Sequence, residues 1–290
     1  MEYLIHIAIL ISIYAILGLS LNLVVGFTGL LSVAQAAFYG LGAYTSAILL
    51  TQSGTGMNFF FALLIGMAIS GAASFLIGIV LSRFKDDYFA LGSLGFNVII
   101  YSVFLNWQSL TRGPLGIPGI PRPEIFGFAF SGNLAFLFLA AAFALAAYFI
   151  CAFISHSSFG RVLKAIREDE QVIGVFGYRT SRYKLAIFVI SATLASAAGS
   201  LFASYITFID PSSFSLTESI FILSIIILGG LANNKGAALG AAALILLPEI
   251  LRFVGFPSDI AAQMRQVVYG SLLILLMLYR PQGLLGEYKL

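Results

Sequence analysis

The residues of this chain that could do chemistry in water are gathered in one short island. Nine of the 27 charged residues (15 basic and 12 acidic) lie between positions 161 and 184. They are Arg161, Lys164, Arg167, Glu168, Asp169, Glu170, Arg179, Arg182 and Lys184. Residues 3–82, 125–160 and 185–209 contain no Asp, Glu, Lys or Arg. A chain with so little charge elsewhere indicates that this mixed-sign island meets something in water.

Catalytic chemistry is not supported by the remaining polar residues. His6 and His156 are solitary, and the single cysteine, Cys151, lies in an apolar run. Neither a nucleophile–base pair nor a metal cluster is available from such a set. The closest approach to a phosphate-binding loop surrounds Lys235, but the glycine before it and the Ser or Thr after it are missing. The sequence therefore predicts a protein that is not an enzyme and has no metal or cofactor of its own.

The composition excludes a water-soluble fold. The chain is 60% hydrophobic and 9% charged, whereas soluble domains carry roughly 25% charged residues. Apolar runs of about 20 residues span a bilayer as helices, because a helix satisfies its own backbone polar groups. The polar stretches 106–132 and 156–184 are too short for a folded soluble domain of at least about 50 residues. We expect an all-α, polytopic helical membrane protein forming a single domain over residues 1–290, with no role in nucleic-acid binding.

Nine apolar runs are candidate membrane spans, and eight to ten crossings remain compatible with the pattern. The runs are 3–25, 29–50, 58–82, 89–106, 133–155, 184–206, 216–232, 236–254 and 263–280. The second run is the least regular, because glycines surround the polar residues Ser32 and Gln35. It could be a broken or re-entrant segment instead of a plain span.

The distribution of basic residues orients these spans. Cytoplasmic loops of membrane proteins are enriched in Lys and Arg. With nine spans, one side receives Arg83, Lys85, the six basic residues of the island, Lys235, Arg280 and Lys289, and the other receives Arg112, Arg122, Arg252 and Arg265. This asymmetry predicts a cytoplasmic island and an external N-terminus. The proline-rich stretch 113–123 is then external, as a rigid connector or a docking surface.

The island itself has the pattern of a short amphipathic helix. Its apolar stripe would be Val162, Ile166, Ile173 and Phe176, with Lys164, Arg167, Glu168 and Gln171 on the opposite side. Gly174 and Gly177 would then weaken the helix and allow a turn. An anionic bilayer would favour a basic face, so the mixed charges favour docking into a groove of another protein.

Some polar residues fall inside the apolar runs. They are Asn22, Gln35, Tyr44, Asn97 and Glu218. Hydrogen bonds between helices are the ordinary role of such residues, and lining a translocation path is the alternative. If the second segment is broken, a substrate carboxylate could also meet the N-terminus of its helix.

The island resembles the cytoplasmic coupling loop of ABC importer permeases, and more narrowly that of the Liv-type, LivM-like branched-chain amino-acid permeases. The matching residues are Gly160-Arg161, Lys164-Ala165-Ile166-Arg167-Glu168-Asp169-Glu170, Gly177 and Arg182-Tyr183-Lys184. Stretches 21–26, 29–32, 37–44, 228–230, 247–249 and 280–285 agree in the same order. Many relatives have His where Gln35 stands and Asn where Asp169 stands.

The resemblance implies the permease subunit of an ATP-driven importer in a bacterial-type cytoplasmic membrane. Its relatives assemble with a second homologous permease, two cytoplasmic ATPase subunits that bind ATP and Mg, and an external solute-binding protein. The residues implied in ATPase coupling are Arg161, Lys164, Arg167, Glu168, Asp169, Glu170, Gly174 and Gly177. The implied substrates are branched-chain or other hydrophobic amino acids, and family members also carry urea and short amides. A secondary transporter driven by an ion gradient is the alternative from a different class.

Overall fold

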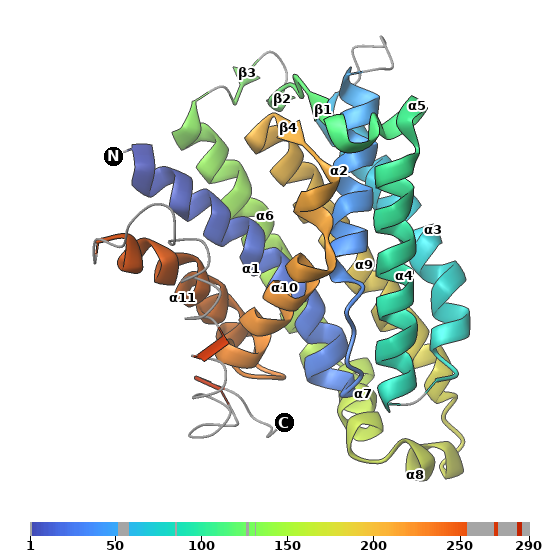
Figure 1. The fold of residues 1–290 in the computed structure, drawn as a ribbon. Coiled ribbons are helices and arrows are strands. Elements are labelled where there is room, and N and C mark those ends of the chain that lie inside the picture. Colours follow the sequence, from blue (N-terminus) through green and yellow to red (C-terminus); the bar gives the residue numbers. More distant parts are fainter. Residues whose placement is uncertain are drawn as a thin grey trace.

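The computed structural model of the chain describes residues 2–51, 58–84, 86–125, 128–130, 132–253, 270–271 and 283–285. These residues form a bundle of helices with short strands at one end (Figure 1). The long helices are α1 (Glu2–Thr28), α3 (Phe59–Leu81), α4 (Asp86–Asn106), α6 (Asn133–His156) and α9 (Thr180–Ile206). The shorter helices are α2 (Gln35–Thr51), α5 (Gln108–Thr111), α7 (Ser158–Glu168), α8 (Glu170–Val175), α10 (Leu216–Gly229) and α11 (Asn234–Phe253), with 3-10 turns at Gly113–Leu115 and Pro211–Phe214. Strand β1 (Ile117–Pro118) pairs with β4 (Phe208–Ile209), and β2 (Glu124–Ile125) pairs with β3 (Phe128–Ala129), both antiparallel.

The all-α, polytopic fold is confirmed, but the predicted count of nine spans is not. Within the described residues, five helices are long and apolar enough to cross a membrane: α1, α3, α4, α6 and α9. Helices α10 and α11 pass the same test only together, and they are bent by 120° at the break between them. The predicted spans 216–232 and 236–254 therefore form one bent pair. The predicted span 263–280 lies outside the described residues except for positions 270–271.

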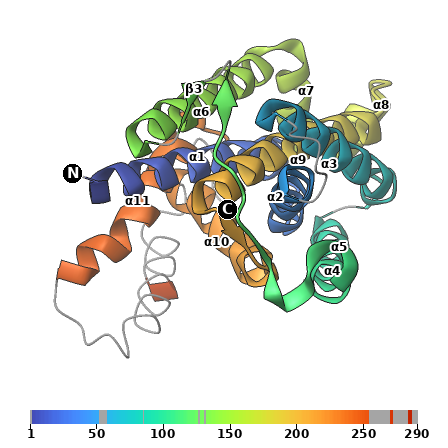
Figure 2. The same cartoon turned by 90° about the horizontal axis from the view of Figure 1, so that it is seen from above.

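Helices α1 and α9 form the centre of the bundle. About 67% of the spanning window of α9 and 56% of that of α1 is buried, against 22% for α6. Figure 2 shows α9 lying among α1, α2 and α3. Small residues allow this close packing. A Cβ atom at Gly42 of α2 would overlap the backbone of Ser196, and one at Gly199 of α9 would overlap the backbone of Tyr39. The crossing of α2 and α9 therefore requires glycine on both helices.

The second predicted span, residues 29–50, is helical only in part. Residues 29–34 are not helical, and α2 begins only at Gln35 and runs for 17 residues. Backbone N–H groups without helical partners must be satisfied inside a membrane protein. The N–H of Val33 donates to Ser93 Oγ at 2.9 Å, and the N–H of Ala36 donates to Ser219 Oγ at 2.9 Å. Serines of α4 and α10 thus replace the hydrogen bonds that the break removes.

The connections gather at two opposite ends of the bundle. At one end, strand β1 of the proline-rich stretch pairs with β4, and His6 near the N-terminus contacts the Tyr205 hydroxyl at 2.6 Å. At the other end, Lys184 reaches the carbonyl oxygen of Phe84 at 3.3 Å, and the 230–235 connection lies close to the end of α1. Arg83, the island and Lys235 therefore lie at the same end of the bundle. The distribution of basic residues in the sequence had assigned these residues to one side of the membrane.

Candidate functional site

The charged island folds as two short helices, α7 and α8, and the predicted single helix is wrong at Asp169. Asp169 has an extended backbone (φ −157°) and ends α7. Its carboxylate accepts the N–H groups of Gln171 at 2.8 Å and Val172 at 3.1 Å, which makes it the N-cap of α8. Asp is favoured at such positions, because its side chain supplies the acceptor that the first turn of a helix lacks. The island therefore has a corner between α7 and α8 (Figure 1), and Asp169 lies at it.

Helix α7 is held against the end of α1. Its buried residues are Gly160, Leu163 and Ile166, so Ile166 is the one fully buried member of the predicted apolar stripe. The Arg167 guanidinium donates to the carbonyl oxygen of Gly26. The stem of the same side chain covers Gly29, where a Cβ atom would lie 3.0 Å from the Arg167 Cγ. Arg167 thus binds α7 to the last turn of α1.

Helix α8 is bound to α9 by a salt bridge. The Glu170 carboxylate and the Lys184 ammonium group are 2.6 Å apart, and the Thr180 hydroxyl donates to the other Glu170 oxygen at 2.9 Å. The Lys184 side chain is only 1% exposed, and its ammonium group also donates to the carbonyl oxygen of Phe84. One lysine therefore links α8, α9 and the connection between α3 and α4.

The outer surface of α8 is apolar and open. Val172 is 47% exposed, Val175 88% and Phe176 73%, and none of the α8 residues is buried. We call these three side chains the α8 face. Exposed apolar groups of this kind occur on surfaces that contact another protein or a membrane.

The predicted coupling residues have different surroundings. Arg167 and Glu170 bind within the chain, as described above, and line a cavity of about 410 Å³ between the end of α1 and the α7–α8 corner. Lys164 lies over the ring of Phe27, with its nitrogen 5.6 Å from the ring centroid. The remaining five are on exposed positions: Arg161, Glu168, Asp169, Gly174 and Gly177. Gly177 has a φ of +87°, which suits glycine at the end of α8.

Asn22 is used to fix the connection between α10 and α11. It is fully buried, and its side-chain oxygen Oδ1 accepts the N–H of Ala232 at 3.0 Å. Its amide nitrogen donates to the side-chain oxygen of Asn234 at 3.4 Å. Both functional atoms of Asn22 are therefore occupied by the protein.

Two of the predicted path residues, Gln35 and Asn97, lie at the N-terminus of α2, and a third, Glu218, is next in sequence to a serine that binds there. The Gln35 amide donates to Ser20 Oγ at 2.5 Å, and the Asn97 amide donates at 3.2 Å to Ser219 Oγ, the atom that also caps Ala36. Glu218, next in sequence to Ser219, accepts the Tyr14 hydroxyl at 2.6 Å. The N–H of Ala36, in the first turn of α2, is thus already bound to a protein group.

Tyr44 lies apart from this group, more than two helical turns further along α2. Its ring stacks on Phe104 at a centroid distance of 4.3 Å and lines an apolar cavity of about 310 Å³ between α2, α3, α4 and α5. Its hydroxyl and the side-chain oxygen of Asn97 have no hydrogen-bond partner among the described residues. Among the five predicted path residues, Tyr44 and Asn97 thus each have a buried polar atom without a hydrogen-bond partner among the described residues.

Four buried serines bind groups of other helices and were not among the predicted site residues. Ser20, Ser93, Ser191 and Ser219 are at most 1% exposed and bind backbone or amide groups across helices. Their signal in the sequence was a small polar residue within an apolar run. Among the described residues, no three His, Cys, Asp or Glu side chains lie together as a metal site.

Comparisons with known proteins agree on one family. The model of the branched-chain amino acid transport system permease component matches residues 3–277. The high-affinity branched-chain amino acid transport system permease proteins LivM of Salmonella typhimurium and Escherichia coli K12 are each 36% identical, over 97% of this chain and 69% of their own length. The corresponding LivH protein of Escherichia coli K12 is 28% identical, over 95% of this chain and 92% of its own length. No solved structure matches the chain.

Proposed function

We propose that this chain, which belongs to the branched-chain amino acid transport permease family, is the permease subunit of an ATP-driven importer. A multi-pass helical membrane protein of this family is a transport subunit and not an enzyme. ATP hydrolysis would take place on two separate cytoplasmic ATPase subunits, with ATP and Mg bound there. The membrane would be a bacterial-type cytoplasmic membrane.

The observation that carries the proposal is the combination of an exposed α8 face and buried attachments behind it. An ATPase subunit would bind Val172, Val175 and Phe176 in a groove. The salt bridge of Glu170 to Lys184 would then transmit its movement to α9, a central helix of the bundle. Arg167 would transmit it to α1 through the Gly26 carbonyl. Interior packing is dense and resists deformation, so such contacts move helices as units.

A second, homologous permease would complete the assembly, together with an external solute-binding protein. This chain resembles both LivM and LivH of Escherichia coli, which carry the name of one high-affinity transport system. The predicted path residues inside the bundle are mostly bound to protein groups, and α2 crosses α9 at glycines. We therefore place the translocation path between two permeases, with Tyr44 and Asn97 as the remaining candidates within this chain. The substrates would be branched-chain or other hydrophobic amino acids, as the names of the relatives suggest.

The test is a double substitution on the α8 face. Val175→Asp and Phe176→Asp change two exposed side chains, so the chain should still insert and purify normally. We expect co-purification of the ATPase subunits and substrate uptake to be lost together. Leu115→Asp is the matched control for ATPase binding, because Leu115 is 82% exposed but lies on the proline-rich stretch at the opposite end of the bundle. It should keep full co-purification of the ATPase subunits. Full ATPase binding by the double variant, or uptake that needs an ion gradient and not ATP, would refute the proposal.

A further inference from the structure

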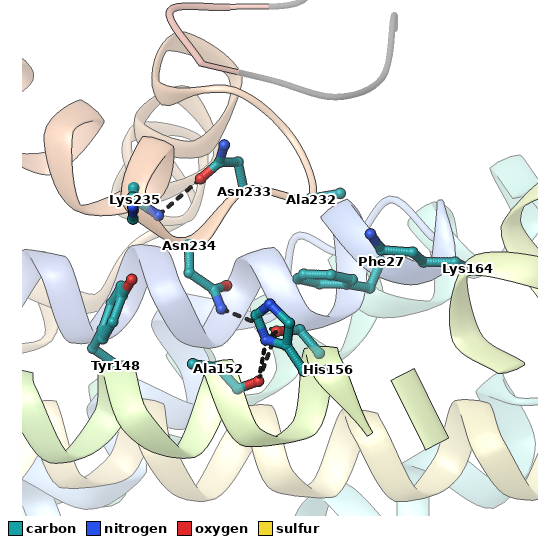
Figure 3. A pocket seen from close by; sticks show the side chains of 10 residues that line it. Phe27, Tyr148, Ala152, His156, Lys164, Ala232, Asn233, Asn234 and Lys235 are labelled. Carbon is teal, nitrogen blue, oxygen red and sulfur yellow. Dashed lines mark hydrogen bonds between the residues drawn. The ribbon is translucent and has the colours of Figure 1, made fainter. Parts of the chain in front are cut away.

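A second cavity lies next to the charged island and is lined by cationic groups. It has a volume of about 250 Å³ and lies between the last turns of α6, the first turn of α11, Lys164 of α7 and Phe27 of α1 (Figure 3). The polar side chains that line it belong to Tyr148, Ser155, His156, Lys164, Asn233, Asn234 and Lys235. No carboxylate is among the described residues of this lining. The chemistry of the cavity therefore suits an anion.

Most of these groups are held in place by contacts of their own. His156 Nδ1 lies 2.7 Å from the Ala152 carbonyl oxygen, and because a carbonyl can only accept, Nδ1 carries the hydrogen. The Asn234 amide donates to Ser155 Oγ at 3.3 Å and so joins α11 to α6. Asn233 caps α11 by accepting the Lys235 N–H at 3.0 Å. Figure 3 shows His156 of α6 and Asn234 of α11, two helices that line the same cavity. Contacts within the protein thus hold these lining side chains in place without a ligand.

The surface beside the cavity is suited to acyl chains. Leu145, Phe149 and Phe153 of α6 are 58%, 66% and 79% exposed, and their spacing of four places them on one helix face. His156, three residues after Phe153, continues the same face into the cavity. A membrane-spanning helix exposes such residues to the hydrocarbon of the bilayer. An apolar strip thus leads directly to a cationic cavity at the end of the bundle that carries most of the basic residues.

We propose that this cavity binds the phosphate group of an anionic phospholipid, with Lys164 and Lys235 as its charge partners. The headgroup would lie between α6, α7 and α11, and the acyl chains would follow Leu145, Phe149 and Phe153. Basic pockets between membrane helices on the positively charged side are suited to anionic headgroups, and each lysine near an anionic surface contributes about 1 kcal/mol. Two lysines correspond to a roughly 30-fold difference in affinity. This inference does not depend on the binding of ATPase subunits.

The experiment measures lipid binding to the purified, delipidated full chain by native mass spectrometry. We expect phosphatidylglycerol to bind more tightly than phosphatidylcholine with the same acyl chains. The double variant Lys164→Gln and Lys235→Gln should weaken phosphatidylglycerol binding roughly 30-fold and leave phosphatidylcholine binding unchanged. Arg161→Gln with Arg179→Gln is the matched control, because it removes two charges from the same end of the bundle outside the cavity. The control should keep the wild-type affinity.

Several results would overturn the proposal. Equal binding of the two lipids, or equal weakening by the control variant, would mean that no specific site exists. If inorganic phosphate competed fully at the same concentration as the lipid, the cavity would bind a free anion instead. Wild-type protein provides a test that does not depend on the folding of a variant: phosphatidylglycerol with a photoreactive acyl chain should label α6 between residues 145 and 153, and labelling elsewhere alone would contradict the assignment.

Discussion

The salt bridge between Glu170 and Lys184 predicts an unequal response to removing either partner. Glu170→Gln leaves the Lys184 ammonium group, with a side chain only 1% exposed, facing a neutral amide and the Phe84 carbonyl oxygen. Lys184→Met leaves a carboxylate that is 23% exposed and still accepts the Thr180 hydroxyl. Removing one partner of a buried pair costs about 3–5 kcal/mol, because the remaining charge is buried without compensation. We expect a loss near the lower end, about 3 kcal/mol, for Glu170→Gln. The loss for Lys184→Met should be about 1 kcal/mol, because water reaches its carboxylate.

The assay is equilibrium unfolding of the purified chain in mixed detergent micelles. Arg182→Met is the matched control, since it removes one positive charge from the start of α9 at an exposed position. It should change the free energy of unfolding by less than about 0.5 kcal/mol. The charge swap Glu170→Lys with Lys184→Glu should restore stability only in part, because a carboxylate at position 184 would face the Phe84 carbonyl oxygen.

The same substitutions have a functional consequence if α8 transmits movement to α9. The α8 face is untouched in Glu170→Gln, so ATPase subunits should still bind and hydrolyse ATP. Uptake per ATP hydrolysed should fall, because α8 is no longer attached to α9 through Lys184. Two results would contradict these expectations. One is equal destabilisation by Lys184→Met and Glu170→Gln, and the other is a wild-type ratio of uptake to hydrolysis in Glu170→Gln.

Further predictions concern packing, the membrane interior and pH. Gly199→Val should prevent correct packing of α9, since its Cβ would overlap the Tyr39 backbone, whereas Gly95→Ala, with open space around it, should leave the elution profile of the purified chain unchanged. Asn22→Ala should lower stability by about 1–3 kcal/mol by leaving the Ala232 N–H unpaired, while the KM for uptake stays constant; a changed substrate preference would contradict this structural role. Burial of Asp210 acts to raise its pKa, but hydrogen bonds from the two serines two and three positions on lower the pKa below its ordinary value near 3.8. This contribution to stability is present at neutral pH and is lost as pH falls through that range. Thermal midpoints measured from pH 6 to 3 should therefore fall less steeply for Asp210→Asn than for the wild type.

The sequence predicted the features that depend on local pattern. Long apolar runs indicated α1, α3, α4, α6 and α9, and the polar Ser32 and Gln35 marked the break before α2. The corner at Asp169 also had a local signal, because an Asp followed by a Glu is typical of the start of a helix. The apolar stripe from Val162 to Phe176 suggested instead that one helix continued through it.

Features that depend on contacts distant in the chain could not be predicted. Glu170 and Lys184 are fourteen residues apart, and their pairing requires α8 to fold back on α9. The bend of 120° between α10 and α11 has no local signature beyond its glycines and asparagines. The apolar runs 216–232 and 236–254 were therefore predicted as two separate spans. The polar residues of the interior were identified, but their partners come from other helices, and the partners decide whether a side chain is structural.

The broken segment before α2 has a consequence for the order in which the protein can be made. The N–H groups of Val33 and Ala36 find their acceptors at Ser93 and Ser219, which are 60 and 183 residues later in the chain. These two hydrogen bonds can therefore form inside the bilayer only after α4 and then α10 have been synthesised. Until then, we expect residues 29–36 to stay in contact with water or with the insertion machinery. We expect the N-terminal third to mature late, although it is translated first.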